Sequence, residues 1–159
     1  MAHKDLTWIT SWVGSVQGPY PEGNPSAQPL LTAVFPQPAQ GARDQSFRLM
    51  VRPGLWGPQT RVRLSNALGT HTVTFADVYV GVQQGSSEVL KGTNQPVTFG
   101  GQRRVSVPAG QSVWSDPVDL PFVRPEILPW LVGRRLAVSF HVPEASGPMT
   151  WHAKALTTS

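Results

Sequence analysis

The sequence predicts an all-β protein, a jelly-roll-like β-sandwich with short strands and long loops rich in proline and glycine. Short runs of β-branched and aromatic residues recur along the chain, and turn residues separate them. The 15 glycines and 16 prolines leave little room for long helices, because Pro removes a backbone donor and Gly raises backbone entropy. No helical periodicity is sustained. Short strands at this spacing are typical of a sandwich or a barrel.

The strands are expected in order along the chain, and each follows from alternation or from β-rich composition closed by a turn. They are residues 6–13, 47–52, 61–64, 71–82, 89–90, 96–99, 103–107, 112–114, 118–120, 134–142 and 149–156. A short extended piece is expected at 30–35, and one helical turn at 125–132. The change of phase around Asp77 predicts a β-bulge.

Alternation also predicts which side chains face the core. Apolar residues alternate with Arg48, Met50 and Arg52 in one strand, and with Arg61 and Arg63 in the next, so the basic face should be outward. The residues expected to share one core are Phe47, Leu49, Val62, Leu64, Val138 and Phe140.

The length of 159 residues fits one domain, residues 1–159, in which 1–6 and 18–45 are expected to be partly irregular. The chain has no cysteine, which excludes disulfides and thiolate metal sites. No apolar run approaches the roughly 18 residues of a membrane span, so none is expected. The first residues, MAHKD, contain no apolar signal-peptide core, and a signal peptide is therefore not expected in this chain.

The formal net charge is +4, and a basic balance raises the possibility of nucleic-acid binding. The arginines, however, are spread over separate strands, with no long basic run and no known nucleic-acid-binding pattern. We therefore expect solvated or ion-paired strand faces, and no nucleic-acid partner.

No catalytic residue, metal ligand or cofactor is expected from the motifs. A G-x-S-x-G elbow, a GDS block, a G-x-N-D block and an Asp three residues before a His are all missing. His71, His141 and His152 lie far apart in sequence, without the short spacing of a metal site. Asp116 and Asp119 could serve acid–base chemistry, but an Asp that caps a turn is the favoured interpretation.

Two residues are candidates for substrate binding. Asn66, after Ser65, closes an alternating run, and such a residue most often hydrogen-bonds the following turn; in a carbohydrate-binding module it could grip a sugar hydroxyl. The six tryptophans could fill the core or form a stacking platform. Trp56, flanked by Gly and Pro, is the best candidate for an exposed one.

Three segments carry a family resemblance over nearly the whole chain from Trp8 onward. They are FRLMVRPGLWGPQTRVRLSNALGTHTVTFADVYV, KGTNQPVTFGGQRRVSVPAGQSVWSDPVDL and RRLAVSFHVPEASGPMTWHAKALTTS. Their order resembles the N-terminal β-sandwich module that precedes the catalytic domain in a group of SGNH/GDSL-type esterases. The chain departs from the pattern at Met50, where a polar residue is usual, and in an inserted segment around Trp130.

The resemblance implies a non-catalytic part of a serine esterase, which supports the hydrolase domain and forms one wall of its substrate cleft. It implies a hydrolase domain after Ser159, either in the same polypeptide or as a separate or nicked chain, and an ester or acylated-carbohydrate substrate. It places Trp151, His152 and Leu156 at the contact with that domain, and it implies a secreted or periplasmic parent protein. A free-standing carbohydrate-binding module is the alternative, and a structural or adhesion sandwich is a third.

Overall fold

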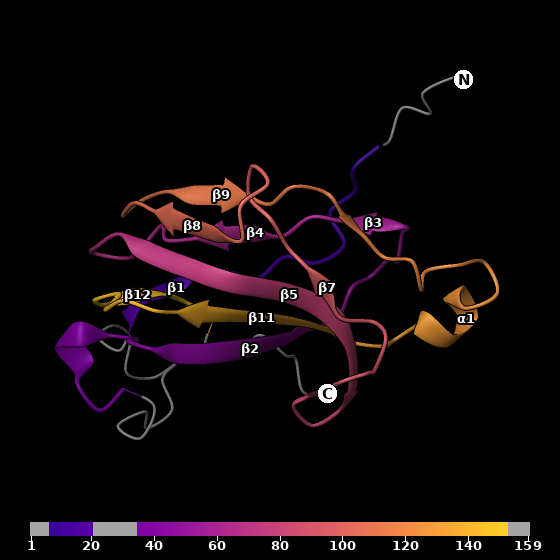
Figure 1. The fold of residues 1–159 in the computed structure, drawn as a ribbon, viewed down its shortest axis with the longest axis horizontal. Helices are drawn as coiled ribbons and strands as arrows, with labels where there is room; N and C mark the ends of the chain where they lie inside the picture. Colours follow the sequence, from indigo (N-terminus) through magenta and orange to yellow (C-terminus); the bar gives the residue numbers. More distant parts are fainter. Residues whose placement is uncertain (1–6, 21–34, 153–159) are drawn as a thin grey trace.

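The structure is a computed structural model, and it describes residues 7–20 and 35–152. Strands dominate these residues and stack in two layers, which confirms the predicted all-β, sandwich-like class (Figure 1). The elements are β1 (Gln17–Tyr20), η2 (Pro38–Gln40), β2 (Gln45–Val51), β3 (Gln59–Thr60), β4 (Arg63–Ser65), β5 (Val73–Gly85), β6 (Glu88–Val89), β7 (Gln95–Pro96), β8 (Arg104–Val107), β9 (Ser112–Trp114), β10 (Val118–Asp119), α1 (Leu128–Leu131), β11 (Leu136–Val142) and β12 (Met149–Trp151).

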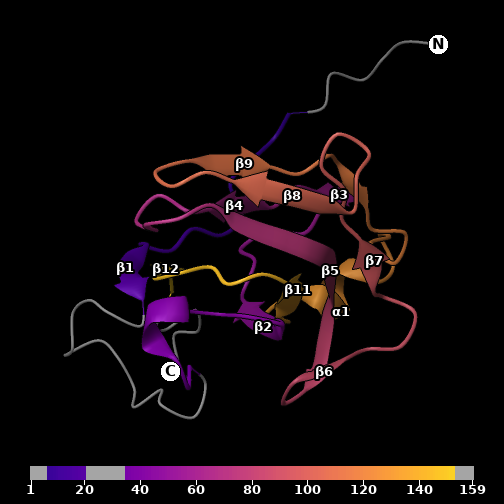
Figure 2. The ribbon, with the colours of Figure 1, turned by 60° about the vertical axis from the view of Figure 1, so that its left-hand side comes forward.

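The main sheet is built around β11, which lies between β2 and β5 and is antiparallel to both. Its pairing with β2 runs without a break from Leu136 opposite Val51 to Val142 opposite Gln45. One edge of β5 pairs with β11, and the other edge of β5 pairs in turn with β8, β7 and β6. The long β5 thus has partners on both edges in its middle part, and Figure 2 shows its course from beside β8 down to β6.

The second layer is an antiparallel ribbon in which β4 pairs with β9 and β3 pairs with β10. Ser115 joins the two halves of this ribbon, because its hydroxyl accepts the Val62 N–H at 3.0 Å and its own N–H donates to the Val62 carbonyl at 2.9 Å. The side chain of Ser115 is buried. A small hydroxyl thus satisfies the backbone where the regular ladder is interrupted.

The predicted bulge at Asp77 is present. The register between β11 and β5 shifts between the pairs Ser139–Tyr79 and His141–Ala76, and Asp77 has a left-handed backbone with φ of 47°. Buried positions change phase there, from Val73 and Phe75 before the bulge to Val78, Val80 and Val82 after it. An extra residue in one strand produces this phase change.

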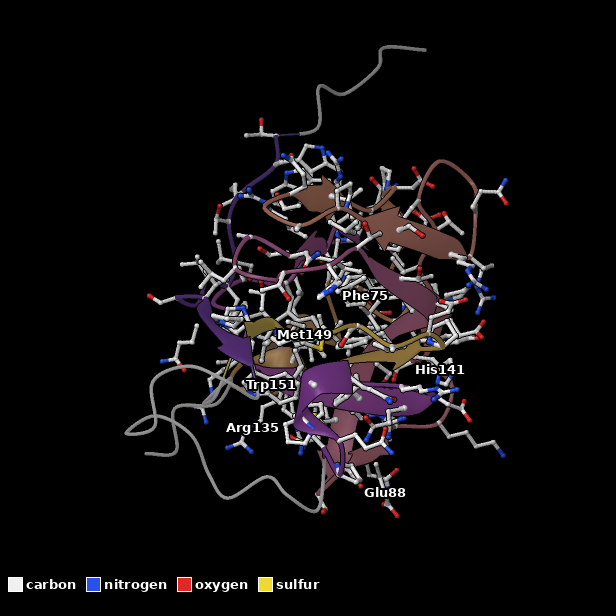
Figure 3. The ribbon with its side chains drawn as sticks, turned by 90° about the vertical axis from the view of Figure 1, so that its left-hand side faces the viewer. Phe75, Glu88, Arg135, His141, Met149 and Trp151 are labelled. Atoms are coloured by element: carbon white, nitrogen blue, oxygen red, sulfur yellow. The ribbon has the colours of Figure 1, made fainter. Side chains whose placement is uncertain are left out.

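One apolar cluster fills the space between the layers, and the six predicted core residues all belong to it. Leu64 and Phe140 are buried, whereas Phe47, Leu49, Val62 and Val138 are partly buried against the cluster. Phe140 stacks on Phe47 and meets Phe75 edge to face. Figure 3 shows Phe75 and Met149 in the interior between the layers.

The prediction of a strand at residues 6–13 is wrong for the described part of that range, which holds no strand. Ser11 explains why: its hydroxyl donates to the Leu55 carbonyl and accepts the Leu55 N–H, and its carbonyl accepts the Gly54 N–H at 2.7 Å. The backbone of this segment is thus bonded at Ser11 to a loop, and not through a ladder to a strand. The first strand comes later, as β1, and all but its first residue falls in the range 18–45 that was expected to be partly irregular.

Met50 is a second correction, because it was placed on the outward face and is buried. It pairs with Ala137 in the neighbouring strand, which is also buried. The helical turn expected at 125–132 is present as α1, and its Leu131 is buried as well. The outward face of the main sheet is therefore partly covered. Residues 30–34 of the expected extended piece lie outside the described residues.

Candidate functional site

A strip of exposed apolar side chains is the most unusual surface of the described residues. It is formed by the segment before β1, which crosses the surface without joining a sheet. Val13 is 81% exposed and Ile9 is 66% exposed. We call this set the N-terminal strip, and its members are Trp8, Ile9, Trp12, Val13 and Val16. Exposed large apolar side chains gathered in one short segment are typical of interaction sites in folded proteins.

Two arginines connect this strip to the ribbon of β4 and β9. The Arg61 guanidinium lies over both Trp8 and Trp114, 5.5 Å from each ring centroid, and Arg63 lies 5.8 Å from that of Trp114. Hydrogen bonds hold both arginines in place: Arg61 Nε donates to the Ser115 carbonyl, and Arg63 donates to the Ser112 hydroxyl. Trp114 is 54% exposed and so extends the apolar surface onto β9.

The described chain ends beside the strip. β12 pairs with β1, and His152 Nδ1 lies 3.0 Å from the Ser15 carbonyl oxygen. His152 also meets Trp12 edge to face, with ring centroids 5.5 Å apart. A segment that continues from His152 therefore starts at one end of the N-terminal strip.

Trp151, predicted to contact another domain, packs partly buried against the core. Its ring meets Phe35 and Phe47 edge to face, at 5.8 and 5.5 Å. This arrangement is the one expected if Trp151 completes the core. Leu156, the third residue of that predicted contact, lies outside the described residues.

Trp56, chosen as the tryptophan most exposed to a ligand, is partly buried instead. It packs against the main cluster and meets Phe122 edge to face, at 6.4 Å. Its neighbour Leu55 is the exposed residue of that loop. The flanking glycine and proline correctly indicated a turn. They did not indicate exposure, because the side chain of Trp56 points from this turn toward the core.

Asn66, the other candidate for substrate binding, is only 1% exposed. Its amide Nδ2 donates to the carbonyls of His71 and Val107, at 2.8 and 2.9 Å. Gly69 packs directly on this amide, because a Cβ added there would lie 1.8 Å from Asn66 Oδ1. The side chain thus joins the turn after β4 to the end of β8, in line with the turn role favoured from the sequence.

Asp116 also organises a turn, although a different one from that expected. Its carboxylate accepts the N–H groups of Gly100 and Gly101, at 3.0 and 2.8 Å, and the Thr98 hydroxyl at 2.7 Å. The Gly101 N–H, followed by the Thr98 hydroxyl, lowers the pKa of this carboxyl below its ordinary value. Asp119 binds Gln59 separately, and its carboxylate does not share these partners.

One side-chain cluster was not anticipated from the sequence. The Ser46 hydroxyl lies 3.1 Å from His141 Nδ1, and Asp44 lies 3.4 Å from His141 Nε2. Ser46 and His141 are direct partners in the pairing of β2 with β11. Both strands were expected, but their pairing was not, and only the pairing brings these side chains together across a separation of 95 residues.

The order Ser–His–Asp resembles that of a hydrolytic triad, but the environment differs. In such a triad a buried Asp holds the imidazole in one tautomer and stabilises the imidazolium. Asp44 is 88% exposed, so water screens its charge and leaves its position loosely fixed. The geometry is that of a cross-strand polar pair on a sheet surface.

No group of three His, Cys, Asp or Glu side chains that could hold a metal ion occurs in the described ranges 7–20 and 35–152. Within the same ranges, no helix is long and apolar enough to cross a membrane. No protein-family model matches the chain, and no curated protein matches it.

Proposed function

We propose that this chain is the non-catalytic β-sandwich part of an SGNH/GDSL-type serine esterase, and that it binds the hydrolase domain through the N-terminal strip and Trp114. The exposed apolar strip beside the point where the described chain ends is the observation that carries this proposal. The family itself is proposed from the resemblance of the three sequence segments.

Burial of the strip supplies the driving force. Apolar surface removed from water contributes about 25 cal/mol per Å². The strip offers two tryptophans and three aliphatic residues, and Trp114 adds a third large ring. Tryptophan and arginine are enriched among the residues that dominate binding energy at interfaces, and Arg61 and Arg63 lie at the edge of this surface. A second domain that covers the strip would bury these apolar side chains and would contact Arg61 and Arg63 at their edge.

The position of His152 supports an intramolecular arrangement. A domain connected after this residue is tethered next to the strip, and tethering raises its effective concentration there. In the parent protein the sandwich would then form one wall of the cleft in which an ester or acylated carbohydrate is hydrolysed.

A carbohydrate-stacking platform is the competing use of these tryptophans. A sugar ring stacks on an open aromatic face. Arg61 lies over both Trp8 and Trp114, so a guanidinium occupies one face of each ring. This favours a protein partner at the strip over a saccharide.

Hydrogen exchange tests the proposal. The hydrolase domain is supplied as a separate polypeptide, and amide exchange is followed over residues 7–16, 112–114 and 150–159. We expect slower exchange in these segments and co-elution of the two chains. Identical exchange in both samples, without co-elution, would contradict the proposal.

A matched pair of variants locates the contact. Val13→Asp places a charge within the strip, at a side chain that is 81% exposed and so contributes little to the stability of the free chain. Val132→Asp makes the same change at a side chain of similar exposure, beside α1 at the opposite end of the sandwich from β1 (Figure 1). We expect the first variant to weaken association at least about tenfold and the second to leave it unchanged.

A further inference from the structure

A shallow depression lies on the outward face of the main sheet, away from the N-terminal strip. Its volume is about 520 Å³ and it crosses β2, β11 and the bulge of β5. Its lining combines the side chains of a polar surface with two residues of the aromatic core: Ser46, Phe47, Arg48, Asp77, Ser139, Phe140 and His141. Figure 3 shows His141 at the margin of the sandwich, on β11 beside β2.

The bulge places Asp77 at this depression. A non-glycine residue with φ of 47° is uncommon, and Asp is one of the few residues that tolerate it. Bulges redirect side chains next to functional sites, and backbone strain is concentrated at such sites. Two contacts fix the conformation: the Asp77 N–H donates to the Arg103 carbonyl at 3.1 Å, and Arg103 Nη2 bonds Asp77 Oδ1 at 3.1 Å. Arg103 is itself held over the Tyr79 ring, at 4.7 Å.

The donors on the opposite side are also held in place. Arg48 Nε donates to the Ser139 hydroxyl at 2.7 Å, and Nη1 donates to the Ser87 carbonyl. Among the described residues, Arg48 Nη2 and Asp77 Oδ2 have no hydrogen-bond partner. A guanidinium donor and a carboxylate acceptor are thus fixed on one concave surface, each with bonding capacity left over.

The charges around the depression balance. Of the lining residues, Arg48 brings one positive charge and Asp77 one negative charge. Arg103, which pairs with Asp77, and Asp44, which pairs with His141, add one charge of each sign at the margin. A site for an anion or a cation would carry an excess of the opposite sign. Carboxylate and guanidinium together, with serine hydroxyls between them, instead match a ligand whose neighbouring groups each donate and accept. We infer that this depression binds a neutral polyhydroxylated ligand, namely a saccharide whose hydroxyls are held by Asp77 on one side and by Arg48 on the other.

The volume falls within the range of about 300–1,000 Å³ that is usual for small-molecule sites. The depression is open, and the ligand would remain partly hydrated. We therefore expect weak affinity, with a dissociation constant near 1 mM.

Amide chemical shifts of the full chain provide the test. The probes are the neutral tetrasaccharides of β-1,4-xylose, β-1,4-glucose and β-1,4-mannose, each titrated to roughly 20 mM, with tetragalacturonate as the charged comparison. We expect at least one neutral probe to shift the amides of residues 46–48, 77–79 and 139–141 in a saturable manner. We expect the residues of the N-terminal strip to remain unshifted.

Three variants assign the effect to the named groups. Asp77→Asn keeps a residue that tolerates the left-handed backbone but removes the charged acceptor, and we expect about tenfold weaker binding. Arg48→Lys keeps the charge but loses the planar fork, with a similar loss expected. Asp119→Asn makes the same change as the first variant outside the depression, where Asp119 binds Gln59, and should leave the affinity unchanged.

The inference is overturned if no neutral probe shifts these amides. It is also overturned if tetragalacturonate binds more tightly than every neutral probe, or if Asp77→Asn and Asp119→Asn have equal effects. None of these outcomes depends on whether a hydrolase domain binds the strip.

Discussion

Trp12 and His152 lie edge to face, with ring centroids 5.5 Å apart, and they join the first and last described segments of the chain. The pairing of β1 with β12 and the contact between His152 and Ser15 add to this connection. A domain attached after β12 would consequently lie next to the segment that carries the N-terminal strip.

The isolated chain is expected to lack esterase activity. Among the described residues, the Ser46 hydroxyl lies 3.1 Å from His141 and the Thr70 hydroxyl lies 2.9 Å from His71. The exposed Asp44 does not hold the His141 ring as the Asp of a triad does. The measurement is hydrolysis of short-chain p-nitrophenyl esters by the purified chain. Turnover that survives repurification and is abolished by Ser46→Ala or His141→Ala would show that this expectation is wrong.

Leu64→Ala is expected to lower the free energy of unfolding by about 2–5 kcal/mol, because the side chain is 9% exposed and belongs to the main core cluster. Urea denaturation measures the loss. Leu55→Ala is the control, since Leu55 is 60% exposed and its truncation should change stability by no more than about 0.5 kcal/mol. Equal effects of the two substitutions would refute the assigned burial.

Asn66→Asp is expected to lower the free energy of unfolding strongly, although it replaces only an amide group with a carboxylate of similar size. A carboxylate cannot donate to the carbonyls of His71 and Val107, so two acceptors would face a buried charge. The free energy of unfolding, measured by urea denaturation, should fall by about 3 kcal/mol or more. The exposed Asn94→Asp provides the matched comparison, with a change within about 0.5 kcal/mol. A mild effect at Asn66 would instead indicate an amide that is accessible from solvent.

Asp116 should make stability depend on pH in the acid range. Its folded-state pKa is lowered, so the ionised form is stabilised by folding. The contribution is fully present above the unfolded pKa of about 3.9 and is lost as pH falls through the lower, folded value. We expect the stability difference between the natural chain and Asp116→Asn to be largest above about pH 5 and to shrink below pH 4. A difference that stays constant down to pH 2 would contradict this account.

The fold class and the positions of most strands could be predicted from the sequence, because alternation records which face of a strand is buried. The strand 112–114 matches β9 at both ends, and the phase change at Asp77 revealed the bulge. The same logic failed at residues 6–13, where the composition is typical of a strand but Ser11 bonds a loop instead. Composition does not specify the partner of a segment.

The candidate sites were less predictable for the same reason. Exposure of Trp8 and Trp114, and burial of Trp56, depend on which loops lie above each ring. The depression exists because β2 pairs with β11 in one register and β5 bulges beside them. Pairing between strands so far apart in sequence leaves no local signal, whereas the turn role of Asn66 was indicated by its immediate neighbours.

The central place of β11 has a consequence for how the protein assembles during synthesis. β2 and β5 are not neighbours in the sheet; each pairs with β11, which is synthesised after both of them and is the last but one of the described strands. Some 90 residues separate partners such as Arg48 and Ser139. Non-local pairing of this kind folds slowly and leaves unpaired strand edges exposed in the meantime. A chain truncated before residue 136 should therefore aggregate rather than form a smaller sandwich, since its two longest strands would have no strand between them.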